Sequence, residues 1–214
     1  MGGVRAIAFD FNGTLSHDEP VLLAIYQQLF AEHGRPLTAA EYFDTLAGNT
    51  EEAIVGGWLG VEGAELERLV AERSERYRAA ADGSTVSAAT RAAVRHAAER
   101  VPVVVVSGAN RREIEPVVDA AGLTDCFRAI VAADDVVHGK PHPEGYLLAA
   151  SLLAPGVDPA SIIAFEDTEA GIASAKAAGL RCVGVRGTLP DERLGAADLL
   201  VDRIDADLIR SLVG

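Results

Sequence analysis

Short runs of apolar residues, many of them β-branched, recur along the chain and alternate with segments of helical pattern. The runs cover residues 4–9, 101–106, 129–132, 162–165 and 182–185. Such alternation is typical of a parallel sheet whose strands are joined by crossover helices. Residues 103–106 are four valines, so both faces of this strand are apolar and we expect helices to cover both. The pattern therefore predicts an α/β fold.

The pattern changes between residues 16 and 82, where helical stretches follow one another without a convincing strand. We expect helices at residues 20–33, 38–47, 51–59 and 64–81, and a further helix at 88–100 after this segment. Pro20 suits the first turn of the first helix, and Gly34 can end it. We therefore predict a core of residues 1–15 and 83–214 that carries an inserted helical domain of residues 16–82.

Composition narrows the class of protein. The 214 residues are 49% hydrophobic, 24% charged and 5% aromatic, as in an ordinary globular protein. The formal net charge is −13, and its 32 acidic residues are spread along the chain without a run. Such a charge repels nucleic acid and anionic membranes, so we expect neither as a partner. A small anion would have to be bound by a few local cations, a metal ion or backbone amides.

The two cysteines and the first residues bear on the compartment. Cys126 and Cys182 lie far apart without a Cys-x-x-Cys pattern, and we interpret them as reduced thiols of a cytosolic protein. The sequence shows neither a secretion signal nor a long apolar stretch that could span a membrane. We expect a cytoplasmic protein that is a monomer or a weak homodimer.

Polar residues end three of the predicted strands. Asp10 follows the first strand, Ser107 follows the second, and the pair Glu166 and Asp167 follows the fourth. The carboxyl ends of parallel strands share one edge of the sheet, where ligands bind in such folds. Each residue alone is more often a turn, cap or surface residue. Together they predict a site for phosphate chemistry at this edge.

Four motifs in series give the chain a family resemblance. They are Phe-Asp-Phe-Asn-Gly-Thr-Leu at 9–15, Ser-Gly at 107–108, Lys-Pro at 140–141, and Phe-Glu-Asp-Thr at 165–168 followed by Ala-Gly at 170–171. In this order they resemble the haloacid dehalogenase superfamily, most closely the branch of phosphoglycolate phosphatases and β-phosphoglucomutases. That branch inserts its helical cap just after the first motif. The resemblance implies a Rossmann-like core and a hydrolase of small phosphorylated metabolites.

The resemblance also implies a nucleophile and a metal site. Asp10 would attack phosphorus and form an aspartyl-phosphate, which divides one displacement into two. A carboxylate is repelled by a phosphate dianion, so a cation must lie between them. Mg²⁺ prefers hard oxygen ligands, and Asp10, the backbone carbonyl of Asn12 and Asp167 would supply them, supported by Glu166. We therefore expect Mg²⁺ as cofactor.

The remaining motif residues would hold the phosphoryl group. By the same resemblance Ser107 would donate a hydrogen bond to it, with the backbone amides of Gly108 and Ala109 near a helix N-terminus. Lys140 would neutralise charge on Asp10 and on the phosphoryl group. The other contributors expected in this cradle are Thr14 and the loop amides near Gly13. Phosphoryl transfer needs chiefly such positioning and charge stabilisation.

Asn12 stands where enzymes of this branch carry the aspartate that protonates the leaving group. An amide cannot transfer a proton, and general acid–base catalysis contributes about 10²–10⁴-fold. The chain is then a phosphatase for good leaving groups, a phosphatase that uses His17 or Glu19 instead, or an impaired protein that binds or senses a phosphometabolite. An engineered Asn12 is a further possibility.

Two other reactions of the superfamily fit less well. The acidic pair at 166–167 is unnecessary for a halide leaving group. Phosphonoacetaldehyde hydrolysis needs a lysine from the cap, and residues 16–82 contain none.

The cap offers few signals of substrate choice. We expect Arg35 and Gly48 to contact substrate, and consider Glu51, Glu52 and Trp58 as further candidates. Arginines and glutamates interleave along residues 65–78, which favours a solvated helix face. These arginines are Arg68, Arg73, Arg76 and Arg78. The histidines without ligand spacing are interpreted as surface or packing residues, and the last two of them flank Lys140. They are His33, His96, His138 and His142.

Overall fold

The computed structural model describes residues 3–153 and 156–214 and has a six-stranded parallel sheet at its centre. The strand order is β3-β2-β1-β4-β5-β6. The strands are β1 (Ala6–Phe9), β2 (Val103–Val106), β3 (Ala129–Val131), β4 (Ile162–Glu166), β5 (Arg181–Val185) and β6 (Leu199–Val201). The predicted α/β fold is confirmed. The edge strand β6 was missed because its apolar run is only three residues long, and the strand is only partly covered.

In the described part of the chain, five α-helices lie between β1 and β2, one follows each of β2, β3 and β4, and the last follows β6. They are α1 (Glu19–Glu32), α2 (Ala39–Glu41), α3 (Glu51–Leu59), α4 (Gly63–Ala80), α5 (Ala88–Ala98), α6 (Arg111–Ala120), α7 (Glu144–Leu153), α8 (Glu169–Ala177) and α9 (Ala206–Val213). The single helix expected at 38–47 is instead the short α2 followed by a π-helical turn, Tyr42–Leu46. Thr38 and Glu41 form a capping box that starts α2.

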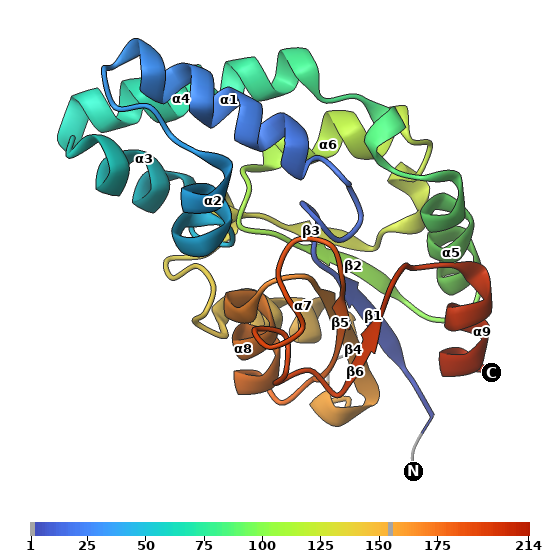
Figure 1. Cartoon of the computed structure of the whole chain (residues 1–214). Coiled ribbons are helices and arrows are strands. Elements are labelled where there is room, and N and C mark those ends of the chain that lie inside the picture. Colours follow the sequence, from blue (N-terminus) through green and yellow to red (C-terminus); the bar gives the residue numbers. More distant parts are fainter. Residues whose placement is uncertain (1–2, 154–155) are drawn as a thin grey trace.

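The sheet is covered on both faces, as its all-apolar strands require. Side chains alternate along each strand. Ile7 and Phe9 pack in one core cluster with residues of α5, α6 and α9. Ala6 and Ala8 face the opposite cluster, which is built with α7 and α8. Figure 1 shows α5 and α9 on one side of the strands and α7 and α8 on the other.

We call residues 16–82 the cap segment. The structure describes all of them and finds helices and turns but no strand. The cap segment has an apolar cluster of its own, which includes Tyr26, Phe30, Ile54 and Leu69. Figure 1 shows α1, α3 and α4 gathered beyond one end of the sheet. The division into a core and a cap domain at residues 15 and 83 stays a prediction.

The cysteines and the helices bear on the predicted compartment. Cys126 is half-buried and Cys182 is buried, and neither forms a disulfide. Among residues 3–153 and 156–214, every helix is too short or too polar to cross a membrane.

Candidate active site

The loop after β1 presents Asp10 at the carboxyl end of the central strand. Asp10 is buried, and its backbone amide donates to the carbonyl of Phe165 at 2.9 Å. The loop then turns tightly, because Gly13 donates to the carbonyl of Ser16 at 2.7 Å. Gly13 has a φ of +74°, and a Cβ there would overlap the carboxylate of Asp167. Glycine is therefore required for the loop to lie against this neighbouring strand end.

Three buried carboxylates meet at the ends of β1 and β4. Phe9 is in register with Phe165, so Asp10 lies beside Glu166 and Asp167. Each of the three offers an oxygen within 4.8 Å of the others. The shared edge predicted from the polar strand ends thus becomes a cluster of acidic side chains.

Lys140 supplies the cation inside this cluster. Its Nζ lies 2.5 Å from Asp10 Oδ1 and 2.6 Å from Glu166 Oε1, and it donates to the carbonyl of Val106 at 3.0 Å. Burial by itself lowers the pKa of the ammonium, but the two carboxylates outweigh it and raise this pKa above its ordinary value. Lys140 is therefore charged, and one lysine faces three acids.

The unbalanced negative charge fits a divalent cation. Burial raises the pKa of Glu166 to about 7, even though Lys140 opposes it, and burial with repulsion from Asp10 raises the pKa of Asp167 well above its usual value. Glu166 Oε2 is buried and has no hydrogen-bond partner. Carboxylate oxygens are the ligands that Mg²⁺ prefers, so the donor set Asp10, Glu166 and Asp167 fits that ion.

Hydroxyl groups orient the same carboxylates. Thr14 donates to Asp167 Oδ1 at 3.2 Å, Thr188 donates to Asp167 Oδ2, and Tyr146 donates to Glu166 Oε1 at 2.5 Å. Thr14, expected in the phosphate cradle, thus points to a proposed metal ligand. Thr188 and Tyr146 were missed, and nothing in the local sequence marks Thr188. Tyr146 belongs to the stretch Lys-Pro-x-Pro-x-x-Tyr, which is the one signal that could have found it.

Ser107 follows β2 and lies beside the start of α6. Its Oγ accepts a hydrogen bond from the Ala109 amide at 3.0 Å. The amide of Ala109, expected to bind phosphate, is therefore engaged by Ser107. Both residues and Gly108 line the same cavity as Asp10.

That cavity lies between the strand ends and the cap segment, and its volume is about 80 Å³. The core lines it with Asp10, Asn12, Ser107, Gly108, Ala109, Lys140, Asp167 and Thr168. The cap segment lines it with Glu19, Leu22, Tyr26, Tyr42, Gly48, Asn49, Thr50, Glu51, Ile54 and Arg73. Most of the predicted site residues therefore surround one small polar cavity.

The expected substrate contacts of the cap segment are only partly brought together. Gly48 lines the cavity, with a φ of +86° and Thr168 beside it. Arg35 is not among the lining residues, and its guanidinium lies 5.9 Å from the ring centroid of Trp58. Trp58 Nε1 donates to the carbonyl of Arg35 at 2.9 Å. Glu52 lines a neighbouring cavity, whereas Glu51 lines the one that contains Asp10.

The interpretation of the α4 arginines as a solvated face is wrong for Arg73. This residue is 3% exposed, and its Nη1 lies 2.9 Å from Glu51 and 2.5 Å from Glu113 of α6. The guanidinium also lies over the rings of Tyr26 and Tyr77. Arg73 shares the i, i+3, i+4 stripe of the buried Leu69, Val70 and Tyr77, a signal that the alternating charges obscured.

Asn12 is tied to the beginning of α1. Its Nδ2 donates to Asp18 Oδ2 at 2.9 Å and lies 3.4 Å from the hydroxyl of Tyr77, which also donates to Asp18. Burial raises the pKa of Asp18 above its usual value. Asn12 thus supplies a hydrogen bond to a buried carboxyl of the cap segment.

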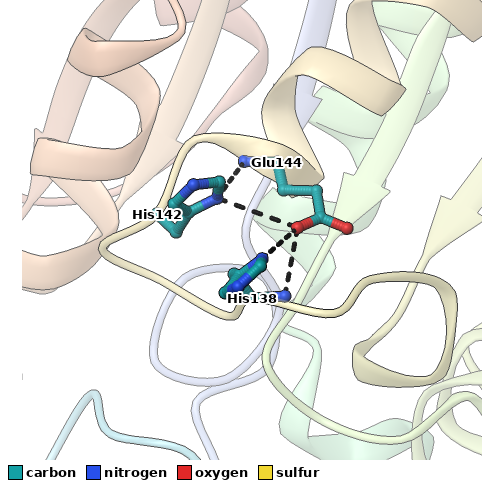
Figure 2. A group of neighbouring side chains, drawn as sticks. All are labelled: His138, His142 and Glu144. Carbon is teal, nitrogen blue, oxygen red and sulfur yellow. Dashed lines mark hydrogen bonds and ion pairs between the residues drawn. The ribbon is translucent and has the colours of Figure 1, made fainter.

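The histidines lie outside the cavity around Asp10. His138 and His142 are exposed, on the loop that carries Lys140, and Figure 2 shows both beside Glu144. The Glu144 carboxylate accepts from the amides of Val137 and His138 and lies 2.9 Å from His138 Nδ1. These polar atoms are therefore used to shape the loop before α7. His33 and His96 lie near helix ends, where His33 Nδ1 is 2.8 Å from the carbonyl of Leu29 and His96 Nδ1 is 3.1 Å from Arg100 Nη1.

A model of the haloacid dehalogenase-like hydrolase family matches residues 4–179. The chain belongs to this family. The resemblance drawn from the four motifs is thereby confirmed, and the protein is a haloacid dehalogenase-like hydrolase.

Several relatives of this hydrolase are named as phosphatases. The validoxylamine A 7'-phosphate phosphatase of Streptomyces hygroscopicus subsp. limoneus is 34% identical over 200 residues, which are 92% of each chain. The phosphoglycolate phosphatase of Pectobacterium atrosepticum is 31% identical, over 86% of this chain and 81% of its own. The fructose-1-phosphate phosphatase YqaB of Escherichia coli is 30% identical, over 84% of this chain and 95% of its own.

Solved structures agree with the fold of this hydrolase. CbbY from Rhodobacter sphaeroides in complex with phosphate is 25% identical and covers 96% of both chains with a TM-score of 0.82. A β-phosphoglucomutase from Clostridium difficile has the same TM-score at 21% identity, over 98% of this chain and 97% of its own. The Rossmann-like core expected from the motifs is therefore confirmed.

Proposed function

We propose that this hydrolase is a Mg²⁺-dependent phosphatase that releases phosphate from a small phosphorylated metabolite through an aspartyl-phosphate on Asp10. The observation that carries the proposal is the buried cluster of Asp10, Glu166 and Asp167 around the Nζ of Lys140, at the floor of a cavity that the cap segment closes. The phosphatase names of its relatives support the same reaction.

The residues divide the work in the following way. An oxygen of Asp10 forms a bond to phosphorus while the bond from phosphorus to the leaving oxygen breaks, and water later releases phosphate from Asp10. Lys140 holds Asp10 in place and offsets charge beside it. Asp10, Asp167 and the backbone carbonyl of Asn12 would hold Mg²⁺, with Glu166 in support. When bound, the ion neutralises phosphate charge near the nucleophile.

The cavity supports a small substrate, because its volume is about 80 Å³ in this arrangement of the cap segment. Ser107 and the amide of Gly108 are the proposed phosphate contacts, with Gly13 and Thr14 shaping the loop beside them. Gly48 is the proposed substrate contact of the cap segment, and Arg35 would reach substrate only after the cap segment moves. Opening and closing would admit the substrate and then exclude water. Hydrogen exchange showing a rigid cap segment would contradict that motion.

We also expect a cytoplasmic protein that is a monomer or weak homodimer and acts on metabolites rather than on nucleic acid or membranes. The reason is the net charge of −13, which repels those polyanions.

A second candidate is a phosphometabolite-binding or regulatory protein with little turnover. Asn12 is the observation that favours it, since this side chain cannot transfer a proton and is engaged by Asp18.

The test is an assay of purified protein on p-nitrophenyl phosphate and acetyl phosphate with Mg²⁺. We expect phosphatase activity that is removed by chelation with EDTA. The variant Asp10→Asn should lower this activity on the order of 10⁴-fold or more. The variant Asp167→Asn should lose both the activity and the Mg²⁺ binding that calorimetry measures. Tight phosphate binding without turnover would favour the binding protein. Activity that survives Asp10→Asn would refute Asp10 as nucleophile.

A further inference from the structure

The proposed reaction requires a proton donor that Asn12 cannot be. The leaving alkoxide of a phosphate ester must gain a proton, and the water that later attacks must lose one. The amide of Asn12 is held by Asp18 at 2.9 Å. A carboxyl or imidazole from another position must therefore supply the proton for poor leaving groups.

Three titratable residues follow in sequence, and only one of them reaches the cavity. His17 is exposed and does not line it. Asp18 is buried, accepts hydrogen bonds from Asn12 and Tyr77, and does not line the cavity either. Glu19, at the first turn of α1, lines the cavity that contains Asp10. Of this group, Glu19 alone lines the cavity that contains Asp10. The other cap-segment carboxyl in that cavity, Glu51, is paired with Arg73 at 2.9 Å.

The surroundings of Glu19 hold its carboxyl in place. The hydroxyl of Tyr42 donates to Glu19 Oε2 at 2.9 Å. Burial raises the pKa of Glu19 to about 7, opposed by the Tyr42 hydrogen bond. The other charged groups that act on it are Asp18 and Asp10, which raise this pKa, and Arg73 of α4, which lowers it. A carboxyl with a pKa near neutrality can both give and accept a proton.

We propose that Glu19 is the general acid and general base of this hydrolase, in the role that Asn12 cannot fill. The inference rests on the proposed phosphatase function and adds a catalytic residue to it.

Both half-reactions balance with Glu19 in this role. In the first, an Asp10 oxygen bonds to phosphorus, the bond to the ester oxygen breaks, and the Glu19 carboxyl gives its proton to that oxygen. In the second, the Glu19 carboxylate takes a proton from water, the water oxygen bonds to phosphorus, and the bond to Asp10 breaks. The products are an alcohol and inorganic phosphate, and Glu19 is protonated again.

The experiment compares two leaving groups in Glu19→Gln. Glycerol 3-phosphate has an alkoxide leaving group that needs a proton, whereas p-nitrophenolate leaves without one. We expect kcat/KM, which reports the steps up to departure of the leaving group, to fall about 10²–10⁴-fold for glycerol 3-phosphate or for another alkyl phosphate that the wild type hydrolyses. For p-nitrophenyl phosphate kcat/KM should change little, whereas kcat can fall on both substrates because hydrolysis of the aspartyl-phosphate is common to them. The retained aryl phosphatase activity shows that the variant is folded. His17→Gln is the matched control and should match the wild type on both substrates.

Tyr42→Phe gives a second, independent readout. The Tyr42 hydroxyl favours the carboxylate form of Glu19, so its removal should raise the pKa of Glu19. The value of kcat/KM for an alkyl phosphate requires the protonated form of Glu19 and declines as pH rises through this pKa. We expect the decline to move to higher pH in Tyr42→Phe and to vanish from the residual activity of Glu19→Gln, with circular dichroism to check folding.

The possible failures are distinguishable. Equal losses of kcat/KM of Glu19→Gln on both substrates, or no loss on either, overturn the role of Glu19 and leave the phosphatase function intact if Asp10→Asn is inactive. A wild type without activity on any phosphate ester, or activity that persists in Asp10→Asn, overturns the proposed function and this inference together.

Discussion

At the scale of single residues, a neutral amide lies against a buried carboxyl. Asn12 donates to Asp18, and Tyr77 of α4 donates to the same oxygen of Asp18. An aspartate at position 12 would bring a second carboxyl to Asp18 and would lose the donor that Asn12 provides. Asn12 and Asp18 are therefore coupled, and a change at one is best tested with a change at the other.

We expect Asn12→Asp to lower the free energy of unfolding by about 1–3 kcal/mol at pH 8, because Asp18 loses a hydrogen-bond donor in a buried place. The double variant Asn12→Asp with Asp18→Asn exchanges the two groups and keeps one amide against one carboxylate. It should recover most of the loss. Urea denaturation of the two single variants and the double variant measures the coupling. Additive effects would show that the two side chains do not interact.

At the scale of elements, α8 packs its first turn against the end of β4. Thr168 caps this helix by accepting from the Gly171 amide at 3.1 Å. A Cβ at Gly171 would overlap the carboxylate of Glu166. The glycine of the Ala-Gly pair at 170–171 thus allows the helix to approach a proposed metal-site residue.

We expect Gly171→Ala to destabilise the fold by about 1–3 kcal/mol, because the added methyl group must displace Glu166 or the helix. Mg²⁺ binding should weaken in the same variant. Gly57→Ala in α3 is the matched control, since nothing lies within 4 Å of its Cβ position. It should stabilise the protein by about 0.5–1 kcal/mol. Denaturant melts and calorimetry measure both effects, and an unchanged melt for Gly171→Ala would contradict the packing argument.

Elements with a strong local pattern could be predicted, and the weaker ones could not. The four valines of β2 and the apolar run of β1 are buried strands, as their composition required. The segment 38–47 has helical composition, but the π-helical turn at Tyr42–Leu46 depends on packing in the cap segment. Strand β6 has an apolar run of only three residues, which is too short to predict a strand without its pairing to β5.

At the scale of the whole molecule, Arg73 connects the cap segment to the core. It pairs with Glu51 of α3 within the cap segment and with Glu113 of α6 in the core. Ser74 and Asn110 add hydrogen bonds to these carboxylates. One guanidinium faces two acids, and burial raises the pKa of Glu51 to about 8 although Arg73 opposes it. The position of the cap segment over the cavity therefore depends on this charge balance.

We expect Arg73→Met to lower the free energy of unfolding by about 3–5 kcal/mol at pH 8, because Glu51 and Glu113 are left buried without their cation. The loss should be smaller at pH 5, where Glu51 is protonated. The direction of this pH dependence follows from the raised pKa of Glu51. A carboxyl whose pKa is higher in the folded state stabilises that state at low pH, and this contribution is lost as pH rises from about 4.5 to about 8.

Arg76→Met is the control for that experiment. Arg76 pairs with Glu32 and Glu72 near the surface, so its loss should change the stability by no more than about 1 kcal/mol. Equal effects of the two variants, or a loss in Arg73→Met that does not vary with pH, would contradict the buried network.

The sequence by itself determined five of the six described strands, their parallel arrangement and the edge at which Asp10, Ser107 and Glu166 lie. Apolar runs and turn residues are local, and parallel strands end on the same side. Only the tertiary structure decided that Arg73 is buried, that Thr14 and Thr188 donate to Asp167, and that Tyr42 donates to Glu19. These contacts join residues from separate elements, so their burial and charge follow from packing, which no short stretch of sequence records.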